Sequence, residues 1–398
     1  IFPKKLKLAK IIPIHKRDNK KDVCNYRPIS VLPTISKIYE KAVYLQLTEF
    51  LETFNLFDKG QHGFRSGRSV VSAAVSFFET IIESVDEGKH TIGVFMDISK
   101  AFDSVKHSKL IEKLKTLGVA NSALKWFRSY LSDRSQYVEI THLSKQNKII
   151  KASSHCNALR FGVPQGSILG PLLFLCYLGA IDKVLAHEPN SELCLYADDA
   201  NLAMSSRSLE ELEIHTFIEL ENIGNYLKNH NLILNSKKTN FVKFKTPQNR
   251  TLKGPTIVCD SFEIEQKNST NFLGLTIDHH LNWDEHIHKL LIKINSGVYA
   301  LRRMSYYSDL KTLKNLYFAY VHSHISFCIA LYGSTKQINM ENILKQQKKA
   351  IRIMLKLKYN DSAKEHFKHL NIFTVYGQYI FESILLAKNQ QLNLNSKT

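Results

Sequence analysis

The sequence lacks the features of several protein classes. Its longest apolar run, Ile168 to Ile181, is too short to cross a membrane and contains a proline and two glycines. The six cysteines are widely spaced and form no C-x-x-C pair, which favours reduced thiols in an intracellular protein over a disulfide framework. Seventeen histidines are scattered without cysteine neighbours, so a zinc site is disfavoured. We therefore expect no membrane association.

Acidic residues are also few. The chain has 36 Asp and Glu against 54 Lys and Arg, which gives a formal net charge of +18 over 398 residues. Such a charge suits a polyanionic partner, and nucleic acid is favoured over a membrane surface because no spanning segment exists. With 44% apolar residues, the chain is long and apolar enough for a folded protein of two or three subdomains.

Two adjacent carboxylates interrupt an apolar stretch near the middle of the chain. Tyr196-Ala197-Asp198-Asp199 separates Leu193-Cys194-Leu195 from the run Ala200 to Met204, which predicts a β-hairpin with both acids at its turn. Carboxylates held against apolar strands repel each other and lose solvation, so they favour a divalent cation. A surface turn with two solvated acids is the alternative.

A second strand pattern also ends in an acid. Thr91 to Asp97 is an apolar run of strand length, and a helical pattern opens after it. If this strand pairs with the hairpin, Asp97 and Asp198 would face each other. They could then hold two hard cations through oxygen ligands, with substrate phosphates completing the coordination. This arrangement is typical of two-metal phosphoryl transfer.

Five motifs occur in the order found in one enzyme family. They are Asn25 to Ser30 (NYRPIS), Phe95 to Asp103 (FMDISKAFD), Gly162 to Phe174 (GVPQGSILGPLLF), Tyr196 to Asp199 (YADD) and Phe272-Leu273-Gly274. Together they resemble the reverse transcriptases of non-LTR, jockey-like retrotransposons, and the resemblance extends from about Lys7 to about Lys358. One departure is Leu178-Gly179-Ala180-Ile181, where the family has an Ile-Asn-Asp-Leu-like segment.

The resemblance implies an α+β, right-hand polymerase fold with an antiparallel palm sheet, helical fingers and an α-helical thumb. We expect fingers over residues 1–90, a palm over 91–278 with interleaved fingers segments at about 110–160, and a thumb with a C-terminal tail over 279–398. Periodicity predicts strands at Leu6 to Ile14, Gln136 to Ile140 and Lys148 to Ser153, and helices at Ser36 to Leu51, Lys109 to Leu117, Ser122 to Leu131, Ser167 to Leu185, from Ser208, and at Glu341 to Lys358. Ile38 and Leu45 are expected on the apolar face of the first helix, and Phe217 on that of the Ser208 helix.

The implied activity is RNA-directed DNA polymerisation, with an RNA template, a DNA primer or target DNA, and dNTPs as partners. Asp97, Asp198 and Asp199 would be catalytic residues that bind two Mg²⁺ ions, or Mn²⁺ in their place. Lys238, in a segment that resembles the family's next motif, would act as general acid at the pyrophosphate leaving group, with Lys237 as the neighbouring candidate. A solvated lysine pair is the alternative.

Two fingers cations are candidates for the triphosphate. Arg27 precedes a proline, which holds it in extended backbone, and a fixed guanidinium can grip phosphates bidentately. Lys10 is a further candidate. A surface salt bridge is the alternative for both residues.

Two later motifs are expected beside the nucleotide. The resemblance places Phe102 under the sugar, where a ring would clash with a 2′-hydroxyl, although a core aromatic is the alternative. Gln165, followed by Gly166, lies on a tight, glycine-flanked turn, so its amide can approach a base pair and sugar closely. Asp103 is expected to cap or pair locally.

Three further groups are expected to bind the template or primer. Arg65 and Arg68 lie in a glycine-rich block before a helix, where backbone amides and guanidinium groups suit phosphates, although a simple glycine turn is the alternative. Leu273 and Gly274 resemble the primer grip. The predicted helix Glu341 to Lys358 has a cationic face that suits a duplex backbone: Lys345, Lys348, Lys349 and Arg352.

Two other readings of the family resemblance stay open. The chain could be an inactive retroelement remnant that only binds nucleic acid, although every expected catalytic position is retained. It could also be a group II intron maturase-like reverse transcriptase. Nuclear localisation follows from the resemblance, because such enzymes prime on chromosomal DNA. The chain begins at Ile1 without a signal peptide, which predicts a fragment of a longer polyprotein.

Overall fold

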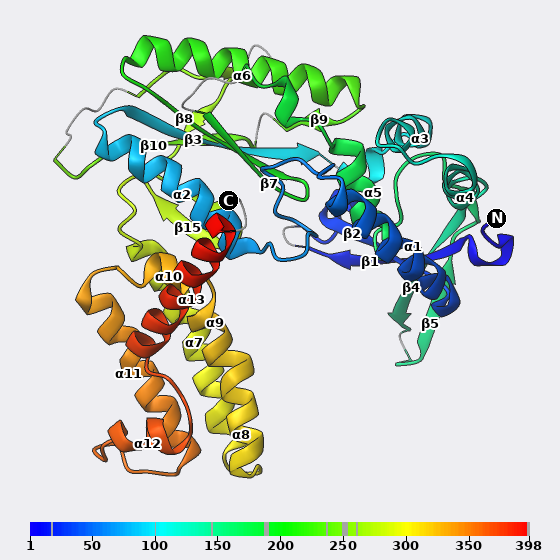
Figure 1. The fold of residues 1–398 in the computed structure, drawn as a ribbon. Helices are drawn as coiled ribbons and strands as arrows, with labels where there is room; N and C mark the ends of the chain where they lie inside the picture. Colours follow the sequence, from blue (N-terminus) through cyan, green and yellow to red (C-terminus); the bar gives the residue numbers. More distant parts are fainter. Residues whose placement is uncertain are drawn as a thin grey trace. The chain divides into compact units, whose positions relative to one another are not determined.

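The computed structural model describes residues 1–16, 19–99, 101–144, 146–186, 191–235, 238–248, 254–259 and 262–395 (Figure 1). The chain divides into two compact units, each described separately below. The predicted boundaries of fingers, palm and thumb stay a prediction. The first unit comprises Ile1–Ser69, Asp86–Phe241 and Lys253–Glu265, and the second comprises Val70–Val85, Val242–Leu252 and Gln266–Thr398.

The first unit is built around an antiparallel sheet. Strand β3 pairs with β8 from His90 to Asp97, and β8 forms a hairpin with β7. The apolar run in β3 is buried on both faces, and its side chains belong to a core that includes residues of helices α5 and α6. Figure 1 shows α6 lying across one side of this sheet. The bounds are β3 (His90–Ser99), β7 (Ser191–Tyr196), β8 (Asp199–Ser206), β9 (Ile233–Leu234), β10 (Asn240–Phe244) and β13 (Glu265–Gln266), in the order β13-β10-β3-β8-β7 with β9 paired to β3.

A second sheet contains the N-terminal strands. The predicted strand at the start of the chain is confirmed as β1, which pairs antiparallel with β2. On its other edge β1 runs parallel to β4, with Leu8 opposite Ser135. The strands predicted at Gln136 to Ile140 and Lys148 to Ser153 are also confirmed, and the corresponding β4 and β5 pair antiparallel. The bounds are β1 (Leu8–His15), β2 (Tyr26–Val31), β4 (Ser135–Leu143), β5 (Ile149–Ser153) and β6 (Asn157–Ala158), with a separate short pair β11 (Val258–Cys259) and β12 (Phe262–Glu263).

Most predicted helices of this unit are present, but one is shorter than expected. Helix α5 ends at Leu178, whereas periodicity predicts a helix as far as Leu185. Gly179 leaves the helix in an extended conformation (φ −53°, ψ 148°), and Ala180 has φ +71°. The helix therefore stops within the segment that departs from the family pattern. The bounds are α1 (Thr34–Thr53), α3 (His107–Thr116), α4 (Asn121–Leu131), α5 (Leu169–Leu178) and α6 (Leu209–Asn229).

The predicted apolar faces of two helices are partly wrong. Ile38 and Leu45 of α1 are 67% and 55% exposed, and Phe217 of α6 is 46% exposed. Helix α1 instead buries Glu40, whose carboxylate accepts hydrogen bonds from the Ser36 hydroxyl (2.8 Å) and from the backbone amide of residue 168 (2.7 Å). Residue 168 precedes α5, so a carboxylate stabilises the positive end of that helix.

The second unit is mostly helical, as predicted for the C-terminal part of the chain. Its only strands among the described residues beyond 266 are β14 and β15, which form a hairpin. Among the described residues, no helix is both long and apolar enough to span a bilayer. The bounds are α2 (Val70–Asp86), β14 (Ser269–Phe272), β15 (Leu275–Asp278), α7 (Asp284–Met304), α8 (Leu310–Tyr317), a π-helical turn (Phe318–His322), α9 (Ser323–Ser326), α10 (Ile329–Tyr332), α11 (Gln337–Met354), α12 (Lys364–His369) and α13 (Val375–Asn395).

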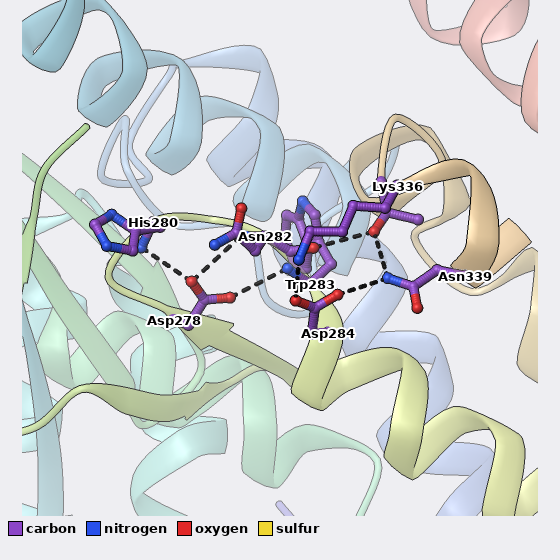
Figure 2. Close-up of polar contacts among 8 residues, drawn as sticks. Asp278, His280, Asn282, Trp283, Asp284, Lys336 and Asn339 are labelled. Carbon is purple, nitrogen blue, oxygen red and sulfur yellow. Dashed lines mark hydrogen bonds and ion pairs between the residues drawn. The ribbon is translucent and has the colours of Figure 1, made fainter. Parts of the chain in front are cut away.

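One carboxylate fixes the connection between β15 and α7 (Figure 2). Asp278 accepts hydrogen bonds from the backbone amides of His280 (2.9 Å), Asn282 (3.3 Å) and Trp283 (3.1 Å). Trp283 has φ +65°, a left-handed conformation that costs energy for a bulky residue. The three bonds to Asp278 offset this cost and set where α7 begins.

A second carboxylate joins the start of α7 to that of α11 (Figure 2). Asp284 accepts hydrogen bonds from Lys336 Nζ (2.5 Å) and Asn339 Nδ2 (2.8 Å). Its place in the first turn of α7 also suits the helix dipole. The two helices of this unit are therefore held together at one end by charge-assisted hydrogen bonds.

Candidate active site

The sheet register brings the three predicted catalytic carboxylates to one end of the β3–β8 pair. Asp97 lies directly opposite Asp199, and Tyr196 of β7 lies opposite Asp199 on the other side. The expectation that Asp97 faces Asp198 is therefore wrong in register, because Ala197 and Asp198 form the two-residue turn. Ala197 has φ +58°, as a tight hairpin turn requires.

The carboxylates interact electrostatically. Burial raises the pKa of Asp198, and repulsion from Asp97 adds to this, whereas the positive charges of Arg27 and Lys16 oppose it. The pKa of Asp199 is raised to about 6, first by lost solvation at the crowded end of the hairpin and then by the charges of Asp198 and Asp97. Because Asp199 keeps contact with water, screening reduces the energetic weight of its shift.

These carboxylates suit divalent cations whose remaining coordination positions are filled by water or substrate. Among the described residues, no set of three or more His, Cys, Asp or Glu side chains is grouped to enclose a metal ion by itself. Mg²⁺ is commonly held by one or two carboxylates together with waters and substrate phosphates, so it needs no closed protein cage. The hard oxygen donors of Asp97, Asp198 and Asp199, whose negative charges repel each other, suit this mode of binding.

A buried glutamine holds the turn that carries Asp198. Gln61 Oε1 accepts hydrogen bonds from the backbone amides of Gly63 (2.8 Å) and Ala197 (3.1 Å). The neighbouring backbone also bonds to β7, with the amide of His62 donating to the carbonyl of Leu195 (2.8 Å). Sequence reasoning missed this role and assigned the block only to the template. The one available signal for this role was that Gln61 follows Gly60, a residue type that tolerates close backbone contact.

Two residues from the segment after β9 contact Asp97. Asn235 donates its side-chain amide to Asp97 Oδ2 (3.3 Å) and its backbone amide to the Asp97 carbonyl (2.8 Å). Lys238 Nζ lies 3.5 Å from Asp97 Oδ2. The structure therefore places Lys238 at the carboxylates, within the region where the general acid is expected. Lys237 lies outside the described residues.

The sequence pattern of the reverse transcriptase (RNA-dependent DNA polymerase) family matches residues 14–277. The chain belongs to the reverse transcriptase family. This range covers well over half of the 398 residues and includes Asp97, Asp198 and Asp199.

Several similar proteins are named as polymerases of mobile elements. The probable RNA-directed DNA polymerase from transposon BS of Drosophila melanogaster is 28% identical over 95% of this chain and 41% of its own length. The RNA-directed DNA polymerase from mobile element jockey of the same species is 27% identical over 88% of this chain and 38% of its own length. The resemblance to non-LTR retrotransposon enzymes is confirmed. The chain spans less than half the length of these relatives.

A solved structure with a similar arrangement is telomerase from Candida albicans in complex with a TWJ fragment of telomeric RNA. It is 13% identical, with a TM-score of 0.49, over 93% of this chain and 66% of that chain. The predicted α+β class is confirmed, because the first unit has two sheets with antiparallel strand pairs and both units contain helices.

The reverse transcriptase places one of the two candidate fingers cations toward its carboxylates. Arg27 is exposed on β2, opposite Ile14, and its charge acts on Asp198. Lys10 instead forms an ion pair with Glu139 (3.2 Å). The contact of Lys10 agrees with the salt-bridge alternative, whereas the charge of Arg27 acts on a predicted catalytic carboxylate.

Phe102 follows β3 in the short 3₁₀ turn η3 (Ala101–Ser104). Its half-buried ring packs against that of Phe174 in α5, with 4.8 Å between ring centroids. One face of the ring is thus supported by the core. This placement is compatible both with a core aromatic and with a rigid gate that is backed by α5.

The loop that carries Gln165 packs tightly against β2. The amide of Ser30 donates to the carbonyl of Gln165 (2.7 Å). Gly166 has φ +126°, and a Cβ atom there would lie 2.5 Å from the Ser30 carbonyl oxygen. Only glycine fits this close approach, so Gly166 keeps Gln165 against the strand that carries Arg27.

Arg65 and Arg68 are largely occupied by contacts within the protein. Arg65 forms two hydrogen bonds to the Glu52 carboxylate (3.1 and 2.7 Å) and one to the carbonyl of Asp58 (3.2 Å). Arg68 donates to the carbonyl of Lys59 (2.6 Å). These contacts favour a structural role for Arg65 over the predicted template contact.

The remaining predicted residues lie in the second unit. Leu273 (φ +47°) and Gly274 (φ +93°) form the turn between β14 and β15. The predicted cationic face of α11 is opposite the side that buries Ile343, Ala350 and Met354. Of its members, Lys345 and Lys349 are exposed, Lys348 is half-buried, and Arg352 is half-buried with its Nε donating to the carbonyl of Asp361 (2.9 Å).

Proposed function

We propose that this reverse transcriptase extends a DNA primer on an RNA template by two-metal nucleotidyl transfer from dNTPs. The observation that carries the proposal is the β3–β8 register, which brings Asp97 opposite Asp199 beside the turn that carries Asp198. The relatives named as RNA-directed DNA polymerases support the same activity. Retention of all three carboxylates argues against an inactive remnant that only binds nucleic acid.

Asp97, Asp198 and Asp199 would hold two Mg²⁺ ions, or Mn²⁺ in their place. When bound, these ions supply Lewis-acid activation of the primer 3′-hydroxyl and neutralise phosphate charge. Asn235 and Gln61 keep the carboxylates in place through Asp97 and the hairpin turn.

Other side chains of the same unit handle the nucleotide. Arg27 binds the triphosphate, because its exposed guanidinium already acts on Asp198. Lys238 lies near Asp97 and donates a proton to the pyrophosphate as it leaves. Phe102 lies under the sugar and excludes a 2′-hydroxyl.

The proposed partners are an RNA template, a DNA primer or target DNA, and dNTPs. The net charge of +18 supports binding to a nucleic-acid backbone. A maturase-like role in splicing is not favoured, because the relatives described above belong to mobile elements that are named as polymerases. A nuclear location is part of the same proposal, because such an enzyme would prime on chromosomal DNA.

The test is extension of a DNA primer on an RNA template by the purified chain with Mg²⁺. Asp198→Asn serves as a matched control, because it keeps the side-chain shape and removes the charge that binds the cation. Wild-type extension is expected, with a loss of about 10²- to 10³-fold in the variant. Binding of the RNA–DNA hybrid is expected to be nearly unchanged. Synthesis by Asp198→Asn at the wild-type rate would refute the metal assignment.

A further inference from the structure

The loop from Gly162 to Gly166 is held on both sides. On one side it contacts β2 through Ser30, as described above. On the other side its backbone bonds to η3 and the turn after it: the amide of Gly162 donates to the carbonyl of Val105 (2.8 Å), and the amide of Val163 donates to that of Phe102 (2.9 Å). The backbone around Gln165 is therefore fixed by main-chain hydrogen bonds to both neighbouring segments.

The side chain of Gln165 has a separate contact. Its Nε2 donates to Asp103 Oδ1 (2.9 Å), a residue 62 positions earlier in the chain. Asp103 is expected to cap or pair locally, and this bond to a distant residue lies outside that expectation. The side-chain amide of Gln has an NH₂ group that donates hydrogen bonds and a carbonyl oxygen that accepts them, and the two groups are similar in shape. A carboxylate only accepts hydrogen bonds when ionised. The end of Gln165 that faces Asp103 must therefore be the donor.

The consequence is that the acceptor end of Gln165 is directed away from Asp103. We propose that Asp103 is a positioning residue that fixes the polarity of the Gln165 amide, so that Oε1 accepts a hydrogen bond from a donor group of the bound nucleotide or its base pair. The inference rests on the proposed function, because it assigns a task to a residue of the same nucleotide site. Asp103 acts through Gln165 and touches no substrate itself.

A second polar residue of the same segment contacts the loop differently. His107 Nε2 donates to the carbonyl of Gly162 (2.8 Å). Burial lowers the pKa of His107, so the ring is neutral near pH 7, and Nε2 carries its proton because a carbonyl only accepts. His107 therefore holds the loop backbone, whereas Asp103 holds the Gln165 side chain. This difference provides a matched comparison.

The test measures nucleotide binding without catalysis. The chain is bound to an RNA–DNA hybrid whose primer ends in a dideoxynucleotide, and the Kd of the matched dNTP is followed through a fluorescent base at the templating position. Wild type, Asp103→Ala, Gln165→Ala and the double variant form a thermodynamic cycle. We expect either single change to weaken binding about 3- to 10-fold, the range for one hydrogen bond. The double variant should be no weaker than Gln165→Ala.

Three further readouts separate positioning from structure. Asp103→Asn keeps the shape but permits either amide orientation, so it should fall between wild type and Asp103→Ala. Melting temperatures of the Asp103 variants should match that of wild type. His107→Ala should lower the melting temperature and weaken binding in the Gln165→Ala background as well.

Independent, multiplicative losses from Asp103→Ala and Gln165→Ala would overturn the inference, as would unchanged nucleotide binding in Asp103→Ala. If the cycle behaves as expected but the wild type extends no primer, the positioning role stands and the polymerase proposal fails. A wild-type complex that binds no nucleotide overturns both.

Discussion

At the residue scale, the active site depends on side chains that are held by partners distant in the sequence. Asp97 is contacted by Asn235, the turn with Asp198 by Gln61, and Gln165 by Asp103. Each of these side-chain contacts is a hydrogen bond between elements that the fold brings together. Catalytic geometry of this kind tolerates little displacement, so these partners are expected to matter to activity.

Phe102 provides a prediction about sugar selectivity. Its ring is backed by Phe174, so it cannot withdraw easily from a 2′-hydroxyl. Replacing Phe102 with Val should raise ribonucleotide incorporation relative to deoxynucleotides by about 10- to 200-fold, the discrimination that a pocket gains from small steric differences. The ratio of kcat/KM values for the two nucleotides measures this effect.

Phe174→Leu is the matched control for this prediction. Phe174 is fully buried, so its truncation disturbs the same ring packing without altering the surface offered to the sugar. It should destabilise the protein and raise ribonucleotide incorporation less than Phe102→Val does, because the Phe102 ring loses part of its support but remains present. Equal gains of ribonucleotide incorporation in both variants would mean that Phe102 is only a core aromatic.

The sequence predicts the acids of the site but not the residues that support them. Asp97, Asp198 and Asp199 are evident because each interrupts an apolar strand, a local signal. Gln61 and Asn235 support the site only because the fold brings distant segments together. The sequence around each residue does not indicate which distant segment it will contact. The register error has the same origin, since the turn length that sets it depends on Ala197 adopting a positive φ.

At the element scale, buried carboxylates form contacts between helices and loops that the spacing of apolar residues does not predict. Helix periodicity does not predict the burial of Glu40, because it predicts Ile38 and Leu45 on the buried side of α1. The helix rotates its polar Glu40 inward because α5 offers backbone amides in need of an acceptor. Strands and helices were predictable from apolar spacing, whereas such helix-end contacts depend on the tertiary fold.

A second buried acid, Asp58, connects the segment after α1 to the end of α5. Its carboxylate accepts the amide of Ala180 (2.7 Å). The pKa of Asp58 is raised to about 7, first by burial and then by a hydrogen bond with Asp182 and the charge of Asp182, against the opposing backbone amides of Ala180 and Ile181. In the folded protein Asp58 therefore holds a proton that the unfolded chain loses near pH 4.

The raised pKa predicts a pH dependence of stability. Between about pH 4 and pH 7 the folded state binds one proton more than the unfolded state, so the free energy of unfolding decreases as pH rises, by about 2–4 kcal/mol in total. In Asp58→Asn, the side-chain oxygen can accept the hydrogen bond from the Ala180 amide and the NH₂ group can donate one to Asp182, and the side chain does not ionise. It should therefore flatten this dependence and be more stable than wild type at pH 8.

The measurement is urea unfolding at pH 5 and pH 8. The chain has two tryptophans, Trp126 in the first unit and Trp283 in the second, so a Trp283→Phe background lets fluorescence report on the unit that contains Asp58. An equal fall in stability with pH for both proteins would contradict the assignment to Asp58.

At the scale of the whole molecule, positive charge should govern binding of the hybrid. The cationic face of α11 is a candidate contact because it lies opposite the buried side of that helix. Reversing Lys345, Lys348 and Lys349 to Glu should weaken hybrid binding and reduce the slope of log K against log salt by about 2–3, one for each lost phosphate contact. Titration of a labelled hybrid at several salt concentrations measures both quantities.

The control is reversal of three exposed lysines in the first unit, Lys4, Lys5 and Lys37. This set changes the net charge by the same amount, so it isolates the position of the charge from its total. Similar losses of affinity for the two sets would show that α11 contributes only to the overall charge.

The parallel pairing of β1 with β4 bears on how the protein is synthesised. Leu8 meets Ser135, so after β1 leaves the ribosome its partner follows on the order of 10 s later, at about 5–20 residues per second. During that interval the edge of β1 offers unpaired amides and carbonyls, and Leu8, Ile12 and Ile14 remain exposed even in the finished fold. Such an edge invites pairing with other nascent chains. The yield of folded enzyme should therefore depend on chaperone supply and on the speed of translation before β4 is made.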